Sequence, residues 1–450
     1  MRKYFGTDGV RGIANTELNS DLAFRLGRAG GFVLSKYSDN KKVKVVVGRD
    51  TRISGDMLES SLISGLMSIG CDVICAGVSP TPAIAYLTRK HKATLGVVIS
   101  ASHNPAEYNG IKFFDLNGYK LDDNIELEIE NYIDNPELID YNPTGEKVGK
   151  KLYVDNNDRL YIDFLKDCLG TDLKGLKVVL DCANGASSFI APTVFKELGA
   201  DVVAINNEPN GTNINDNCGS THTESIQEAV VSNKADIGLA YDGDADRLIA
   251  IDEKGNVLDG DFILMLSALY LKSENKLHDD TLVVTTMSNI GLSICAKENG
   301  INLATTNVGD RYVLEEMKNK GYNLGGEQSG HMIFLDYNST GDGILSSLIL
   351  SKILKLSNKK LSELSSIMVK YPQVLVNARI KNENKHRYNE IIEIKNEIAR
   401  IEELLKDSGR VLIRPSGTEP LVRVMLEGKN RIELEELARN LANMIEFILG

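Results

Sequence analysis

The chain has 450 residues, of which 42% are hydrophobic and 25% are charged. This length is too great for one small core and predicts three or four domains, and the composition is typical of a water-soluble globular protein. A net charge of −12 without a dense block of Lys or Arg argues against binding to a nucleic-acid backbone. It does not exclude a small anionic substrate, because local positive groups can dominate a cleft.

The first residues, MRKYFGTDGV, contain no apolar signal core, and the longest apolar run, FILMLSALYL, is too short to span a bilayer. The six cysteines lack the spacing of a zinc site, so we expect buried, reduced thiols. These observations predict a cytoplasmic protein with no membrane partner and no nucleic-acid partner.

The segment GTDGVRG, near the start of the chain, places Arg11 between glycines. Such a segment can bring a guanidinium group and backbone N–H groups close to an anion. Taken alone, it is equally well explained as an ordinary glycine-rich turn.

Three later blocks of the chain repeat one plan. Each opens with a β-branched run and a small or polar loop: VKVVVGRDTRISG, LKVVLDCANGASS and TLVVTTMSNIGLS. An amphipathic helical stretch follows, and a second strand begins after Gly70, Gly199 or Gly300, each placed where a helix is expected to end. Strands that alternate with helices predict α/β units with largely parallel sheets.

Each block then continues with a third strand, an unusual loop and a fourth strand. The loops are ISASHNP, YDGDADR and GGEQSGH, and the fourth strands are IKFFD, LIAID and HMIFLD. The short link predicts that the third and fourth strands are antiparallel. Because ligands of open α/β sheets bind at the carboxyl ends of strands, we expect the three loops to face one composite site.

The pattern changes after about Tyr371, where QVLVNARI, a charged helical stretch, RVLIRPSGTEPLVRVMLEG and a long helix predict a smaller mixed domain. The sequence therefore predicts an α/β protein with three repeated mixed-sheet α/β domains and a smaller C-terminal α+β domain around one cleft. The expected boundaries are residues 1–155, 156–256, 257–370 and 371–450.

The first loop places Ser102 beside His103 after a buried strand, which raises the possibility of a hydrolase. Neighbouring residues in an extended segment point to opposite sides, so we expect His103 to be badly placed as a base for Ser102. No G-x-S-x-G elbow is present either. A serine that faces a bound divalent ion, with Lys112 sharing the charge of a phosphate, fits phosphoryl transfer better. A serine that merely closes a turn remains an alternative.

The second loop, DGDADR, places Asp242, Asp244 and Asp246 at alternate positions between two apolar strands. Hard oxygen ligands of this kind suit Mg²⁺ or Ca²⁺, and an exposed triad with open positions suits Mg²⁺ engaged with a phosphate. A solvated acidic turn is one alternative. A calcium EF-hand is another, with Glu253 as the bidentate ligand, but Arg247 occupies the position that requires Gly.

The remaining two loops carry hydrogen-bonding and cationic groups. GGEQSGH presents Glu327, Ser329 and His331, which can bind sugar hydroxyls or an amine, although a structural loop explains it equally well. IRPSGTEPLVR combines two guanidinium groups, two hydroxyls and free backbone N–H groups in a cradle suited to phosphate, unless it is a turn with surface arginines. The residues of this second motif are Arg414, Ser416, Gly417, Thr418 and Arg423.

The four loops together, in this order from FGTDGVRG to RPSGTEP, resemble the α-D-phosphohexomutase superfamily over the whole chain. The segments GEQSGH, NGIKFF and YPQVLVN resemble the bacterial branch that acts on glucosamine phosphates. Two departures are Ala245, where many members have Gly, and the continuation PAEYNG after the serine.

The resemblance implies an intramolecular phosphotransferase that interconverts glucosamine 6-phosphate and glucosamine 1-phosphate, for the synthesis of UDP-N-acetylglucosamine. It implies that Ser102, not Ser100, is the phosphoserine, and that Mg²⁺ is bound by this serine and the three aspartates. Glu327 and Ser329 would contact the sugar, and the RPSGTEP loop would hold the non-reacting phosphate. The groups implied near the transferring phosphate or the sugar are Arg11, His103, Lys112, Arg247 and His331.

The expected cofactors are one Mg²⁺ ion, phosphorylated Ser102 and a hexosamine 1,6-bisphosphate that serves as intermediate and activator. The expected partner is a phosphosugar, with an activating kinase or autophosphorylation as the source of the first phosphate, and the chain is expected to be a monomer or homodimer. A phosphomannomutase/phosphoglucomutase is the nearest alternative, although Gln328 replaces the Met common in that branch. A non-catalytic sugar-phosphate-binding or calcium-binding protein is the alternative from another class.

Overall fold

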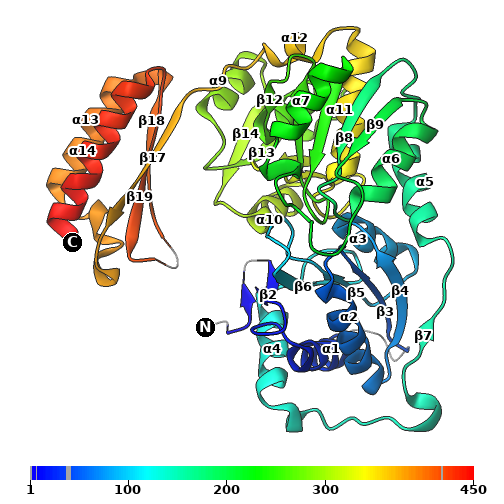
Figure 1. Ribbon diagram of the computed structural model, residues 1–450. Coiled ribbons are helices and arrows are strands. Elements are labelled where there is room, and N and C mark those ends of the chain that lie inside the picture. The colour runs from blue at the N-terminus through cyan, green and yellow to red at the C-terminus, as the bar shows by residue number, and fades with distance from the viewer. Residues whose placement is uncertain (1–2, 7, 37–41, 417–418) are drawn as a thin grey trace. The chain divides into compact units, whose positions relative to one another are not determined.

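The computed structural model describes residues 3–6, 8–36, 42–416 and 419–450 (Figure 1). Its first sheet has seven strands in the order β1-β2-β6-β5-β3-β4-β7. The elements of this region are β1 (Phe5–Gly6), β2 (Gly9–Ile13), α1 (Ser20–Ser35), β3 (Lys44–Arg49), α2 (Ser54–Ser68), β4 (Asp72–Val78), α3 (Thr81–Lys90), β5 (Leu95–Ile99), β6 (Tyr108–Phe114), α4 (Asp123–Asp134) and β7 (Lys151–Leu152).

The central strands of this sheet are apolar throughout because both faces are covered. Successive side chains of a strand point to opposite faces. Val45 and Val47 of β3 pack in one apolar cluster with side chains of α1 and α2, whereas Val46 packs in another with Ile84 and Leu87 of α3. Helices on both faces explain why β3 and β5 read as continuous hydrophobic runs.

The second sheet has five strands in the order β12-β11-β10-β8-β9, and the third has four in the order β14-β13-β15-β16. The elements around the second sheet are α5 (Asn157–Leu169), β8 (Lys177–Asp181), α6 (Ser187–Glu197), β9 (Asp201–Ile205), α7 (Glu224–Asn233), β10 (Ile237–Tyr241), β11 (Leu248–Asp252) and β12 (Val257–Leu258). Those around the third are α8 (Gly260–Ser273), β13 (Thr281–Thr285), α9 (Ile290–Glu298), β14 (Asn302–Thr306), α10 (Asp310–Lys320), β15 (Leu324–Gly326), β16 (Met332–Phe334), α11 (Gly343–Ser357) and α12 (Leu361–Ser365).

The predicted repeat is present in all three sheets. Four consecutive strands have the spatial order second, first, third, fourth in each: β4-β3-β5-β6, β9-β8-β10-β11 and β14-β13-β15-β16. The first three strands are parallel and the fourth is antiparallel to the third, as the short links predicted. Gly70, Gly199 and Gly300 follow the helices α2, α6 and α9 with φ values of 88°, 89° and 64°. This left-handed backbone favours glycine after a helix end.

The C-terminal region contains a three-stranded antiparallel sheet in the order β17-β19-β18. Its two long helices lie on one face of that sheet and close an apolar core around Val424 and Ala438 (Figure 1). The elements are β17 (Gln373–Arg379), α13 (Ile392–Leu405), β18 (Arg410–Pro415), β19 (Leu421–Glu427) and α14 (Arg431–Leu449).

The chain forms two compact units: residues Met1–Met287 with Ile301–Ser366, and residues Ser288–Gly300 with Ile367–Gly450. The helix α9 thus belongs with the C-terminal sheet, where the Asn289 amide donates to Glu427 Oε1 at 3.1 Å. The predicted fold class, three mixed-sheet α/β domains followed by a smaller α+β domain, is confirmed.

No helix in the described part of the chain is both long and apolar enough to cross a membrane. The six cysteines form no disulfide, and four of them are buried while Cys75 and Cys168 are partly exposed. The prediction of free thiols is therefore confirmed, and that of full burial holds for four.

Candidate active site

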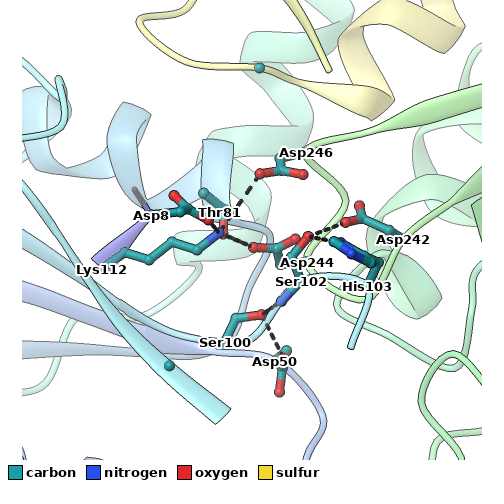
Figure 2. A network of polar contacts seen from close by, with 12 residues as sticks. Asp8, Asp50, Thr81, Ser100, Ser102, His103, Lys112, Asp242, Asp244 and Asp246 are labelled. Carbon is teal, nitrogen blue, oxygen red and sulfur yellow. Dashed lines mark hydrogen bonds and ion pairs between the residues drawn. The ribbon is translucent and has the colours of Figure 1, made fainter. Parts of the chain in front are cut away.

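The loop between β5 and β6 turns sharply at Ser102. Ser102 has φ of 53°, and its backbone N–H donates to Ser100 Oγ at 2.9 Å. The Ser100 hydroxyl in turn donates to Asp50 Oδ2 at 2.6 Å. The Ser102 hydroxyl instead points across to the loop between β10 and β11, where it donates to Asp242 Oδ2 at 2.6 Å (Figure 2). Ser100 therefore supports the loop, and Ser102 faces the acidic loop.

The buried guanidinium of Arg52 holds this loop from behind. Arg52 and Asp50 are both fully buried, and the Arg52 Nε donates to Asp50 Oδ2 at 2.9 Å. One Arg52 terminal nitrogen donates to the carbonyl oxygens of Ser102 and Asn104, each at 2.9 Å. The Asn215 amide donates to the same two carbonyls at 2.9 and 3.0 Å. Because a left-handed backbone is unfavourable for Ser, these contacts are what hold the turn at Ser102.

The predicted separation of Ser102 from His103 is wrong. The two residues do not lie in an extended segment, because the backbone turns at Ser102. As a result His103 Nδ1 lies 3.4 Å from Ser102 Oγ (Figure 2). Burial, together with the neighbouring Arg247 and Arg11, lowers the pKa of His103 to about 4, so the ring is neutral at pH 7. The shortest hydrogen bond of the serine hydroxyl is nevertheless the one to Asp242.

The three aspartates of the second loop converge around the Ser102 hydroxyl. One oxygen atom from each of Asp242, Asp244 and Asp246 lies within 4.8 Å of the others. The triad was expected to be exposed, but Asp242 and Asp244 are fully buried and Asp246 is 4% exposed. Ser102 contacts Asp242, and Thr81 and Lys112 contact Asp244. Ala245, between Asp244 and Asp246, has φ of 58°, a conformation that glycine adopts more easily.

The chemistry of this cluster fits a divalent cation. Asp244 Oδ1 and Asp246 Oδ1 are buried and have no hydrogen-bond partner among the described residues. Burial and the other two carboxylates raise the pKa of Asp242 well above its usual value. A hard cation with oxygen ligands, such as Mg²⁺, would satisfy the orphaned oxygens and relieve this repulsion.

The EF-hand alternative is wrong. The acidic loop is flanked by strands β10 and β11 and not by helices. Glu253 lies away from the triad and accepts hydrogen bonds from the backbone N–H and the hydroxyl of Ser362 at 3.1 and 2.6 Å.

Lys112 brings a positive charge into the same site from β6. Its ammonium group donates to Asp244 Oδ2 at 2.8 Å and lies 3.0 Å from Asp8 Oδ2 and 3.8 Å from Asp246 Oδ2. Burial alone would lower the pKa of Lys112, but the three carboxylates outweigh it and raise the pKa, so the amine remains charged. A charged amine beside the serine can stabilise a transferring phosphoryl group.

Two arginines near the site have unused donors. The Nε atoms of Arg11 and Arg247 are buried and have no hydrogen-bond partner among the described residues. Arg11 pairs with Asp8, and Arg247 Nε lies 4.0 Å from Asp246 Oδ1. Guanidinium donors that the protein leaves unpaired are suited to an anionic ligand.

The third loop joins the site through His331. His331 Nδ1 lies 3.5 Å from Asp246 Oδ2, and Nε2 lies 3.5 Å from Asp310 Oδ2. Burial favours the neutral ring, but the two carboxylates outweigh it and raise the pKa of His331. Glu327 and Ser329 lie on the same loop; the Glu327 carboxylate accepts from the Gly309 N–H at 3.0 Å and Ser329 is exposed.

The fourth predicted motif lies in the C-terminal unit. Arg414 of β18 and Arg423 of β19 are direct cross-strand neighbours. Two like charges in this position destabilise a sheet unless an anion lies between them. The Ser416 side chain is buried, and its hydroxyl accepts from the Glu419 N–H at 3.2 Å. Gly417 and Thr418 lie outside the described residues.

Several residues at the site were missed by the sequence reasoning. Arg52 lies in GRDTR, directly after the first strand of block one, and this position at a strand's carboxyl end was a usable signal. Asp8 lies three residues before Arg11 in the first motif. Lys120, Asp310 and Asn215 carry no such signal, because they lie outside the motifs and reach the site through contacts made in the folded chain.

Four family models match the chain in sequence, and together they cover most of its length. They describe phosphoglucomutase/phosphomannomutase alpha/beta/alpha domain I (residues 2–140), domain II (159–255), domain III (259–371) and the C-terminal domain (375–444). The chain therefore belongs to the phosphoglucomutase/phosphomannomutase family, within the α-D-phosphohexomutase superfamily that the motifs indicated. Its class of protein is the phosphohexose mutases, which are isomerases.

Within this family, the chain is similar in sequence to proteins named phosphoglucosamine mutase. The chain is 70% identical to phosphoglucosamine mutase of Clostridioides difficile (strain 630) and 58% identical to that of Clostridium novyi (strain NT), each over 446 residues and 99% of both chains.

Solved structures share the fold. A phosphoglucomutase/phosphomannomutase family protein from Burkholderia thailandensis superposes with a TM-score of 0.81 at 23% identity, over 99% of this chain and 98% of that one. N-acetylphosphoglucosamine mutase of Aspergillus fumigatus, in complex with GlcNAc-6P and magnesium, has a TM-score of 0.69 at 19% identity, over 100% and 96%.

Proposed function

We propose that the protein is a phosphoglucosamine mutase that interconverts glucosamine 6-phosphate and glucosamine 1-phosphate through phosphorylated Ser102 and a bound 1,6-bisphosphate. The single observation that carries the chemistry is the contact of Ser102 Oγ with Asp242 Oδ2 at 2.6 Å, within a buried aspartate triad beside Lys112. The 70% identity to a curated phosphoglucosamine mutase supports the choice of sugar.

Mg²⁺ held by Asp242, Asp244, Asp246 and Ser102 would supply charge stabilisation to the transferring phosphoryl group. The ammonium of Lys112 supplies a second positive charge at the same place. The unpaired Nε donors of Arg11 and Arg247 are available to the oxygens of the transferring group or of the sugar phosphate.

The reaction needs two phosphate stations because the substrate carries phosphate at one end and accepts it at the other. Ser102 donates its phosphoryl group to O1 of glucosamine 6-phosphate. The 1,6-bisphosphate turns end for end, and Ser102 then takes back the phosphoryl group from O6, leaving glucosamine 1-phosphate. The number of phosphoryl groups is the same before and after one cycle.

The second station is the loop with Arg414, Ser416 and Arg423, together with Gly417 and Thr418. The direct pairing of Arg414 and Arg423 across β18 and β19 supports an anion here. Glu327 and Ser329 are the proposed sugar contacts, with His331 beside them. Carboxylate and hydroxyl groups can hydrogen-bond the sugar in both of its orientations.

We further propose the domain boundaries 1–155, 156–256, 257–370 and 371–450, which the ranges of the four family models support. The protein is proposed to act in the cytoplasm, since its six free cysteines suit a reducing compartment. The first phosphate on Ser102 is proposed to come from a kinase, from autophosphorylation or from a hexose 1,6-bisphosphate.

A substrate panel tests this function. Glucosamine, glucose and mannose 6-phosphates are supplied with Mg²⁺ and a trace of hexose 1,6-bisphosphate, and glucosamine 6-phosphate is expected to have the highest kcat/KM. A clear preference for mannose 6-phosphate would replace the proposed sugar and leave the mutase chemistry in place.

A matched pair of serine variants tests the reactive residue. Ser102→Ala should abolish turnover and remove the phosphate that intact-mass spectrometry detects after incubation with hexose bisphosphate. Ser100→Ala, two residues away and bound to Asp50, should still be phosphorylated. Phosphate retained on the Ser102→Ala protein would refute the assignment.

A further inference from the structure

A closed circuit of acidic and basic side chains passes through the site, and three of its members, Asp8, Lys120 and Asp310, have no role in the proposed chemistry. Starting from the acidic loop, each group lies within 4.0 Å of the next, and the two contacts of His331 are ion pairs when its ring is protonated. We call this circuit the charge ring. Its members, in order, are Asp246, Lys112, Asp8, Lys120, Asp310 and His331.

The ring joins three parts of the chain that lie far apart in sequence. Asp8, Lys112 and Lys120 come from the first domain, Asp246 from the second, and Asp310 with His331 from the third. Each positive member lies between two carboxylates: Lys120 contacts both Asp8 and Asp310. Removing any one cation would leave two buried or half-buried carboxylates facing one another.

Lys120 differs from the other cations of the ring. Lys112 and His331 each lie within 4.0 Å of an aspartate of the acidic loop. The two ion pairs of Lys120 are instead to Asp8 and Asp310, neither of which is in the acidic loop. Its ammonium group is held in place, since Lys120 is only 16% exposed and forms a β-bridge with Phe114 of the strand that carries Lys112.

Both carboxylates that Lys120 binds also contact groups at the proposed reaction centre, so fixing their positions fixes those groups as well. Asp8 Oδ1 is bound by Lys120, while Asp8 Oδ2 lies 3.0 Å from Lys112 Nζ and also binds Arg11. Asp310 Oδ2 is bound by Lys120 and lies 3.5 Å from His331 Nε2.

The two ring members from the third domain, Asp310 and His331, are also held in place. Asp310 is the first residue of α10, so its position is set by that helix. The His331 ring rests against Gly341, where a Cβ atom would lie 2.4 Å from the ring. The ring members therefore have little freedom to move separately.

We propose that Lys120 is a positioning residue for phosphoryl transfer: through Asp8 it orients Lys112 and Arg11, and through Asp310 it orients His331 on the sugar-reading loop. The groups around Ser102 and the loop that carries His331 are thereby linked by ion pairs. They are aligned together when the first and third domains are in contact. This inference rests on the proposed mutase function, which supplies the reaction that the ring aligns.

Four variants test the proposal by steady-state kinetics: Lys120→Met, Lys120→Arg, Asp310→Asn and the double variant Lys120→Met/Asp310→Asn. Lys120→Met should lower kcat by about 10- to 100-fold, as for a misaligned reacting group. KM should change by less than about threefold, because no substrate-binding group is removed. Lys120→Arg, which keeps the charge, should recover most of the lost rate.

The control variant is Lys318→Met. Lys318 lies at the same contact between the first and third domains, with its ammonium group 4.1 Å from the centre of the Tyr119 ring, but it is not a member of the charge ring. Its kcat and KM should stay close to those of the unmodified enzyme. A fall in kcat for Lys318→Met equal to that for Lys120→Met would assign the effect to the domain contact and overturn the proposal.

The double variant provides the second criterion. If Lys120 acts on His331 through Asp310, the double variant should lose less rate than the product of the two single losses. Fully multiplicative losses, or a kcat of Lys120→Met equal to that of the unmodified enzyme, would overturn the proposal. Thermal unfolding identifies a variant that fails to fold, and Asp310→Asn then breaks the same contact from the other side.

Failure of the proposed function has a different signature. It would appear as an inactive unmodified enzyme with glucosamine 6-phosphate, before any variant is compared. The ring is then tested on the single step of phosphate transfer from glucose 1,6-bisphosphate to Ser102, followed by intact mass. Equal transfer rates for the unmodified enzyme and Lys120→Met would overturn the ring proposal alone.

Discussion

Arg52→Met should damage both stability and catalysis, and the two effects can be separated. Methionine keeps most of the buried stem of Arg52 but removes the guanidinium, which pairs with Asp50 and donates to the carbonyls of Ser102 and Asn104. Breaking a buried ion pair from one side lowers the free energy of unfolding by about 3–5 kcal/mol, chiefly because the remaining charge is unpaired. The two carbonyls keep a donor in Asn215, so they add little to this loss.

The catalytic effect has a different origin. With the guanidinium gone, the left-handed turn at Ser102 is held by fewer contacts, and a shift of about 1 Å in a reacting group can lower the rate by about 100-fold. The double variant Arg52→Met/Asp50→Asn removes the unpaired charge as well. It should regain most of the stability but remain about as slow as Arg52→Met.

Urea unfolding and steady-state turnover of glucosamine 6-phosphate measure the two effects on the same samples. Arg49→Met is the matched control, because Arg49 pairs with Glu59 and Asp56 outside the serine loop. It should lose little turnover. If the double variant regains stability and also turns over at the rate of the unmodified enzyme, Arg52 does not position the serine loop.

Three further predictions follow from the site and the core. Arg414→Gln should raise KM by about 10-fold or more, as expected for a lost charged hydrogen bond, while the exposed Arg400→Gln should not; an unchanged KM would count against the phosphate station. Asp244→Asn should weaken Mg²⁺ binding, measured by titration calorimetry, by about tenfold or more, and equal binding would remove Asp244 from the ligand set. Burial raises the pKa of Cys182 from 9.0 to about 12, so the unfolded thiol ionises first and stability should fall between pH 9 and pH 12. Unfolding midpoints across this range should fall less for Cys182→Ala, and identical pH profiles would contradict this.

The sequence by itself determined the repeated architecture and pointed to the loops of the proposed site. Hydrophobic runs, helix-ending glycines and short third-to-fourth links are local properties, and they predicted largely parallel strands with an antiparallel third and fourth pair in all three sheets. The spatial order of the strands was not predicted. The aspartates at alternate positions likewise predicted a cation site, because three neighbouring carboxylates repel one another wherever the chain places them.

Only the tertiary structure decided how these loops meet. The prediction that His103 points away from Ser102 was wrong because it assumed an extended backbone, whereas contacts from Arg52 and Asn215 impose a left-handed turn. The triad was expected to be exposed, yet it is buried in contact with Ser102, Thr81 and Lys112 of another domain.

The same reason explains why Lys120 and Asp310 could not be found beforehand. They are 190 positions apart, and neither lies in a motif. The type of a residue and its sequence neighbours set its charge and its local conformation. Its partners depend on which surfaces the folded domains bring into contact. The residue types of each loop could therefore be read from the sequence, whereas the contacts that join the loops depend on the tertiary structure.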